Sequence, residues 1–274
     1  MDIGVSSYSF SGYMRQTSAT LADICGIAKD MGFDGIEFID LPAEGHADEL
    51  EQADALRARC DELGLPVVAY TVRADFLEDE READRLKQKL EVAAHLGAKL
   101  MRHDVTWRTD VPWRDIIART APAIREVTEY AQTLGIATCT ENHGFVLQDA
   151  DRLEALMRAV DHPNYGWLVD FGNFLCADQD PFHALPIAAP YAFHAHAKDF
   201  LLKDSAPGEG WITTRGGRAI RGTVLGHGVV PIAACVSALR QAGYDGWLSL
   251  EFEGWEDCLR AVKAGLAYLR AVTE

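Results

Sequence analysis

A helix-like pattern that ends at a glycine and is followed within two or three residues by a short apolar run recurs along the whole chain. Gly32 precedes the run 35–39 in this way, and Gly64 precedes the run 66–72. Glycine tolerates the left-handed conformation that ends a helix, and a short continuous apolar run suits a strand buried on both faces. The chain is therefore expected to alternate helices with parallel strands.

The same signals predict eight strands. They are expected at 3–8, 35–39, 66–72, 99–104, 136–141, 165–170, 191–197 and 246–251. The segments between them carry helix signals, such as the capping-box spacing of Thr20 and Asp23 and the charged stretches 48–63 and 78–96. Eight strand–helix units in 274 residues predict an α/β protein that is a single-domain (β/α)8 TIM barrel over 1–274. A doubly wound open sheet is the alternative that this pattern leaves open.

Composition narrows the class of protein. With 48% hydrophobic and 25% charged residues, and no apolar run near the roughly 18 residues of a membrane span, the chain is expected to be globular. Its start has no signal-peptide pattern, which predicts a cytoplasmic location. The formal charge of −16 disfavours nucleic acid and anionic membranes as partners. The six cysteines form no CxxC pair and are expected to be reduced.

The connection 199–228, between the seventh and eighth expected strands, is unusually long. Residues 200–228 hold seven glycines together with Trp211 and several basic side chains. Long connections in compact domains tend to be functional or disordered. In a barrel this segment would lie at the C-terminal face, where active sites are built. We expect a lid over the site; a disordered flap and a subunit contact in a homo-oligomer are the alternatives.

Four strand ends carry side chains that bind metals or transfer protons. They are Glu141, Asp170, His196 and Glu251, on the fifth to eighth strands. Singly, each would more often be a helix cap, a salt-bridge partner or a core histidine. On a closed barrel adjacent strand ends lie side by side, and three clustered carboxylates repel one another unless a cation compensates. The set therefore predicts one divalent metal ion, with Mn²⁺ favoured by the oxygen-rich ligands and Mg²⁺, Co²⁺ or Zn²⁺ as alternatives.

Six motifs resemble those of the xylose isomerase-like barrels, which include sugar isomerases, sugar epimerases and endonuclease IV. They are 32–37 (GFDGIE), 141–144 (ENHG), 169–173 (VDFGN), 194–199 (HAHAKD), 225–228 (LGHG) and 249–253 (SLEFE). In the family's ketose 3-epimerases, the positions matching Glu141, Asp170, His196 and Glu251 bind one divalent metal, and the two glutamates are the acid and the base. The resemblance therefore implies a metal-dependent isomerase or epimerase that acts on a small sugar or keto-sugar through an enediolate.

The sequence departs from the epimerase pattern at two positions. Asn173 stands where the epimerases carry a histidine, and Leu202 stands where they place an arginine. The substrate must therefore be held differently. The candidate substrate-binding residues are His103 (with its neighbour Arg102), His143, Asn173, Lys198 and His227.

Three other functions stay open. A site that forms an enediolate next to a ketone can also expel a leaving group, so a metal-dependent lyase or dehydratase acting on a keto-sugar or a 3-keto-glycoside is the main alternative. A DNA repair nuclease is disfavoured by the charge of −16. A sugar-sensing protein would bind metal and ligand but would not need two opposed acid–base carboxylates.

Overall fold

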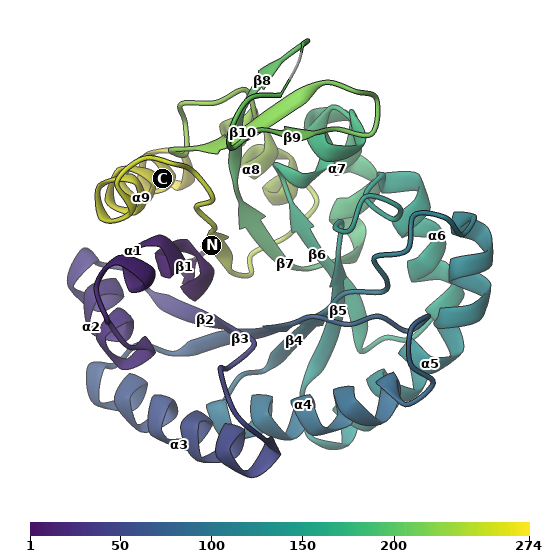
Figure 1. Cartoon of the computed structure of the whole chain (residues 1–274), viewed down its shortest axis with the longest axis horizontal. Coiled ribbons are helices and arrows are strands. Elements are labelled where there is room, and N and C mark those ends of the chain that lie inside the picture. The colour runs from purple at the N-terminus through teal and green to yellow at the C-terminus, as the bar shows by residue number, and fades with distance from the viewer. Residues whose placement is uncertain (206) are drawn as a thin grey trace.

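The computed structural model describes residues 1–205 and 207–274. Eight parallel strands close into a barrel in the order β1-β11-β7-β6-β5-β4-β3-β2, surrounded by helices (Figure 1). The strands are β1 (Ile3–Ser6), β2 (Gly35–Ile39), β3 (Val67–Val72), β4 (Leu100–His103), β5 (Ala137–Glu141), β6 (Tyr165–Asp170), β7 (Ala192–Ala197) and β11 (Leu248–Leu250). Each lies within a predicted strand, so the (β/α)8 barrel is confirmed and the open sheet is excluded.

The outer layer of the barrel consists of helices. They are α1 (Ser11–Gln16), α2 (Leu21–Met31), α3 (His46–Leu63), α4 (Glu82–Leu96), α5 (Trp113–Thr133), α6 (Ala150–Val160), α7 (Pro181–Ala188), α8 (Ile232–Gln241) and α9 (Cys258–Thr273). The capping box at the start of α2 is present, since Thr20 and Asp23 each accept a hydrogen bond from the other's backbone N–H. Gly32 ends α2 at φ 96°, in the left-handed region that favours glycine. Among the described residues, no helix combines the length and the apolar character that a membrane crossing requires.

One part of the barrel interior below the strand ends is apolar. Ala69, Leu100, Cys139 and Leu168 pack together there, all of them buried. Cys139 thus packs beneath Glu141, as expected from the two-residue repeat of a strand. None of the six cysteines forms a disulfide in the structure. The larger apolar core lies between the strands and the helices.

The described residues of the connection 199–228, which leave out residue 206, include regular secondary structure. It contains an antiparallel sheet in the order β8-β10-β9, formed by β8 (Asp199–Lys203), β9 (Ile212–Thr213) and β10 (Ala219–Thr223), at the top of Figure 1. The Asp199 carboxylate accepts hydrogen bonds from the backbone N–H groups of Gly226, Gly228 and Val230. A Cβ at Gly228 would collide with Asp199, so this return of the chain requires glycine. The disordered flap is therefore the wrong description of the described part of this segment.

Candidate metal centre

Four side chains from neighbouring strands meet at the C-terminal end of the barrel. Glu141 ends β5, Asp170 ends β6, His196 lies near the end of β7 and Glu251 follows β11. Nδ1 of His196 lies 3.9 Å from Oε1 of Glu141, 3.8 Å from Oδ2 of Asp170 and 3.7 Å from Oε2 of Glu251. The structure thus brings together all four residues that the strand ends suggested.

The register of the barrel explains this meeting. The strand order β11-β7-β6-β5 places the four strands next to one another, and Asp170 and His196 are direct partners in the pairing of β6 with β7. The backbone N–H of Glu251 donates to the carbonyl of Ala197, 3.0 Å away, which ties the segment after β11 to the end of β7. Asn142 fixes β6 as well, since its side chain bonds to both the N–H and the carbonyl of Asp170.

The cluster has the properties of a cation site. Oδ2 of Asp170 and Nδ1 of His196 are buried and have no hydrogen-bond partner in the described part of the chain. Burial and the neighbouring carboxylates of Glu141 and Glu251 raise the pKa of Asp170 to about 7. Metal–ligand bonds of about 2.0–2.2 Å place ligand atoms roughly 3–4 Å apart around an ion, which is the spacing seen here. The residues therefore fit a divalent cation, which would neutralise the crowded carboxylates.

Each of the two glutamates also contacts a buried cationic side chain. Nη2 of Arg102 lies 2.6 Å from Oε2 of Glu141, and Nζ of Lys198 lies 2.5 Å from Oε2 of Glu251. Burial opposes ionisation of Glu251, but Lys198 and His196 outweigh it and hold the pKa of that carboxyl below its ordinary value. Glu251 is therefore ionised at neutral pH and able to accept a proton.

Asn173 holds the cluster in shape. Its backbone N–H donates to Oδ1 of Asp170 and its side-chain NH₂ donates to Oε1 of Glu141, both over 2.7 Å. Its Oδ1 accepts a hydrogen bond from Lys198, at 3.4 Å. At the position where the epimerases carry a histidine, this chain therefore has an amide that orients two of the four cluster residues.

A cavity of about 600 Å³ opens above the cluster. Its lining includes the predicted residues Glu141, Glu251, His143, Asn173 and Lys198, and also Tyr8, Arg102, Asp104, Trp107 and Ile212. No sequence pattern selects Tyr8 or Asp104, because their place at the cavity depends on contacts between distant segments. Ile212 lies in the connection 199–228, which the sequence predicts to lie over the site. A βα connection at the C-terminal face was the one available signal for Trp107.

Two of the predicted substrate-binding residues lie elsewhere. His103 is fully buried, its ring packs near those of Phe76 and Tyr165, and Nδ1 lies 2.8 Å from the carbonyl of Asp104. His227 is exposed in the turn after β10 and is not among the cavity-lining residues. Of the predicted substrate-binding set, the cavity therefore brings together His143, Asn173 and Lys198.

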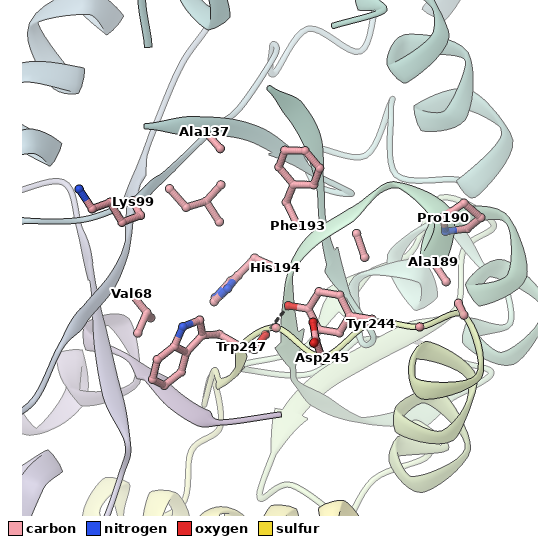
Figure 2. A pocket seen from close by; sticks show the side chains of 15 residues that line it. Val68, Lys99, Ala137, Ala189, Pro190, Phe193, His194, Tyr244, Asp245 and Trp247 are labelled. Carbon is pink, nitrogen blue, oxygen red and sulfur yellow. Dashed lines mark hydrogen bonds between the residues drawn. The ribbon is translucent and has the colours of Figure 1, made fainter. Parts of the chain in front are cut away.

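A second hollow, of about 530 Å³, lies at the opposite end of the barrel (Figure 2). It is formed near the starts of the strands, by residues such as Lys99, Ala137 and Trp247, and the hydroxyl of Tyr244 donates to the carbonyl of Trp247. The described residues that line it include one carboxylate, Asp245, and no second acid with which it could share a cation. Proton transfer next to a carbonyl needs a pair of carboxylates, and such a pair lies at the C-terminal end of the barrel.

The chain matches a family model described as xylose isomerase-like TIM barrel over residues 25–272. It belongs to this family. Its curated relatives include the uncharacterized protein YihM of Escherichia coli, which is 24% identical over 87% of this chain and 68% of YihM. They also include the 3-oxo-isoapionate decarboxylase of Pectobacterium atrosepticum, which is 26% identical over 88% of this chain and 81% of the relative.

Solved structures share the fold. The probable 3-DHS dehydratase AsbF of Bacillus anthracis superposes with a TM-score of 0.78 at 21% identity, covering 98% of this chain and 99% of AsbF. An L-ribulose 3-epimerase superposes with a TM-score of 0.74 at 20% identity, covering 99% of this chain and 94% of the epimerase. A xylose isomerase-like TIM barrel protein of Mycobacterium smegmatis, solved in complex with magnesium, superposes with a TM-score of 0.78 at 17% identity. The match covers 99% of this chain and 96% of that protein. The proteins that this chain resembles are thus named after several different reactions, among them a decarboxylation, a dehydration and an epimerisation.

The variant His196→Ala tests the proposed ligand set. It is expected to weaken binding of Mn²⁺ by more than the roughly 10–100-fold that loss of a ligand's hydrogen-bond partner produces, because the one imidazole of the cluster is removed. Calorimetric titration of metal-free protein, with metal analysis after dialysis, measures this. His183→Ala is the matched control, since that histidine is exposed and pairs with Asp180 on α7, away from the cluster. Unchanged affinity and stoichiometry in His196→Ala would remove this residue from the set.

Proposed function

We propose that the chain is a divalent-metal-dependent sugar isomerase or epimerase that moves a proton next to a carbonyl through an enediolate. The observation that carries this proposal is the placement of Glu141 and Glu251, which both line the cavity. Glu141 ends β5 and Glu251 directly follows β11, and these are the two outer strands of the four. Asp170 and His196 lie between them, on β6 and β7. Two carboxylates on either side of a metal centre are the minimum for removing a proton on one face and returning it on the other.

The metal would be held by Glu141, Asp170, His196 and Glu251, and when bound it supplies Lewis-acid polarisation of a carbonyl and its neighbouring hydroxyl. One glutamate removes the shared proton, and the other returns it. Return on the far face of the same carbon gives an epimer, whereas return at the adjacent carbon gives an isomer. Arg102 contacts Glu141 and Lys198 contacts Glu251, so each carboxylate is held in position before the proton moves.

Mn²⁺ is the metal that we propose, with Mg²⁺, Co²⁺ and Zn²⁺ as alternatives, because three carboxylates and one imidazole accept each of these ions. A small sugar or keto-sugar is the proposed substrate. A cytoplasmic location and assembly into a homo-oligomer stay predictions.

The mouth of the cavity favours a second candidate function. Tyr8, Trp107 and Ile212 line it and are 36%, 42% and 44% exposed. A free sugar has little apolar surface to cover these side chains, whereas a keto-sugar that carries an apolar aglycone would bury them. Elimination of the aglycone from a 3-keto-glycoside, by the same proton abstraction, is therefore the alternative. Relatives named as dehydratases and a decarboxylase support chemistry beyond isomerisation.

Incubation in D₂O with Mn²⁺ and a panel of ketoses, ketose phosphates and 3-keto-glycosides tests both candidates. Deuterium on carbon next to the carbonyl identifies the substrate class by mass spectrometry or NMR. An epimer or isomer as product supports the first function, and a released aglycone supports the second. Metal binding without deuterium exchange from any member of the panel would instead favour a binding protein and contradict both.

Ile212→Ser separates the two functions further. If the mouth holds an aglycone, this variant is expected to raise KM for a 3-keto-glycoside roughly fivefold, because about 1 kcal/mol of apolar contact is lost, and to leave KM for a free ketose unchanged. Steady-state kinetics on both substrates measure this. Phe182→Ser is the control, since Phe182 is an exposed apolar residue on α7 outside the cavity. Equal KM values for variant and parent would contradict the aglycone subsite.

A further inference from the structure

Glu37, on β2, is a charged side chain with no solvent contact in the interior of the barrel. It is 0% exposed, and so are His196 and the metal-centre residue Asp170. The proposed mechanism does not use Glu37, and β1 and β11 separate β2 from β7 in the strand order. A buried carboxylate is costly unless charged or hydrogen-bonding groups compensate it. The two histidines of β7 provide this compensation.

The two oxygens of Glu37 divide between these histidines. Oε1 lies 2.8 Å from Nε2 of His196, and Oε2 lies 2.9 Å from Nε2 of His194. Nε2 of His194 also lies 3.0 Å from the hydroxyl of Ser249. The contact between Oε1 of Glu37 and Nε2 of His196 is short enough for a salt bridge but does not have the angles of a hydrogen bond. Neither of these two atoms has a hydrogen-bond partner among the described residues.

The two nitrogens of His196 thus face different surroundings. Nε2 faces Glu37, and Nδ1 faces the carboxylates of Glu141, Asp170 and Glu251. The partner of one imidazole nitrogen determines which nitrogen carries the proton and which presents a lone pair. We infer that Glu37 is a positioning residue of the metal centre: it holds the proton of His196 on Nε2, so that Nδ1 is the nitrogen that binds the cation. This inference rests on the proposed metal centre and is independent of the reaction carried out there.

The spacing of the atoms distinguishes this role from a second cation site. Glu37, His194 and His196 could also be grouped as three metal ligands. Their facing atoms, however, are in direct contact at 2.8 and 2.9 Å, with Ser249 filling a further direction around His194. In the first cluster the facing atoms stand 3.7–3.9 Å apart, which leaves space between them for an ion. The compact group is thus a support for the ligand rather than a second site.

Glu37→Gln tests the inference, because it keeps the size of the side chain and removes its charge. It is expected to weaken binding of Mn²⁺ and Zn²⁺ to the protein about 10–100-fold, with one equivalent bound per chain in the parent. Glu49→Gln is the matched control, since Glu49 is also a buried glutamate but contacts Tyr70 and Lys89 on the outside of the barrel. It is expected to leave metal affinity unchanged. Equal affinity of Glu37→Gln and the parent would overturn the inference.

A second measurement does not depend on the variant folding. In the Zn²⁺-bound parent protein, ¹⁵N NMR of the histidine rings is expected to show a protonated Nε2 and a metal-bound Nδ1 in His196. Zn²⁺ bound to Nε2 would overturn the inference. Binding of one equivalent through Nδ1 without turnover on any sugar would leave the role of Glu37 intact and contradict the proposed reaction alone. A parent protein that binds no divalent cation would overturn both.

Discussion

Replacing either Glu141 or Glu251 with glutamine is expected to lower kcat for epimerisation or isomerisation by roughly 10²–10⁴-fold, the contribution of a positioned acid or base. Glutamine keeps the shape and can still accept hydrogen bonds, but it cannot take up the substrate proton. Far-UV circular dichroism should therefore stay unchanged. Activity is compared with the metal content of each variant restored, because both residues are also proposed ligands.

Deuterium exchange sharpens this expectation for a two-base epimerase. In each variant one of the two bases remains, and it faces one side of the bound sugar. It can still exchange the proton of the epimer whose proton points to that side. Glu141→Gln and Glu251→Gln should therefore each exchange deuterium into one epimer, a different one in each variant, while converting neither. Glu256→Gln is the control, because this residue bonds to Thr223 away from the cluster. If both site variants keep near-parental turnover once the metal is restored, the acid–base assignment is wrong.

The barrel could be predicted because its signals are local. Gly32 and Gly97 end helices in left-handed conformations, and each next strand begins within three residues. The start of α4 was less predictable: the charged pattern suggested 78, whereas the helix begins at Glu82. Glu82 accepts a hydrogen bond from the backbone N–H of Asp75, and Asp75 in turn accepts one from Thr106. These contacts hold the preceding residues in turns, and a propensity pattern does not contain them.

The metal centre, too, could be predicted only in those features that depend on local sequence signals. The four ligand candidates follow from strand ends and strand order, but the direction of neighbouring side chains does not. On β4, Arg102 faces the cavity and His103 packs outside it. Successive side chains of a strand point to opposite faces, so an error of one residue in the expected register exchanges the faces predicted for Arg102 and His103. The roles of Glu37 and Trp107 depend on contacts across the barrel and between connections, and neither the motif 32–37 nor the position of Trp107 in a βα connection specifies those contacts.

Arg102→Met is expected to lower the free energy of unfolding at pH 7 by about 3–5 kcal/mol, the effect of breaking a buried ion pair from one side. Nη2 of Arg102 lies 2.8 Å from Asp104 and 2.6 Å from Glu141, and all three side chains are at most 5% exposed. Removing the guanidinium leaves two buried carboxylates without their main counter-charge. Arg108→Met is the control, because Arg108 pairs with Asp110 at the surface and its loss should leave stability nearly unchanged.

The dependence on pH identifies the cause of this loss. Burial raises the pKa of Asp104, but Arg102 outweighs it and lowers that pKa to about 2, below the ordinary value of 3.8. A depressed carboxyl pKa stabilises the fold above the unfolded-state pKa, and this stabilisation is lost as the pH falls through the folded-state pKa. The difference between parent and Arg102→Met should therefore be full at pH 7 and shrink below about pH 4. Urea unfolding of the metal-free proteins across this range measures it. A difference that is as large at pH 3 as at pH 7 would mean that the arginine acts through the packing of its stem and not through its charge.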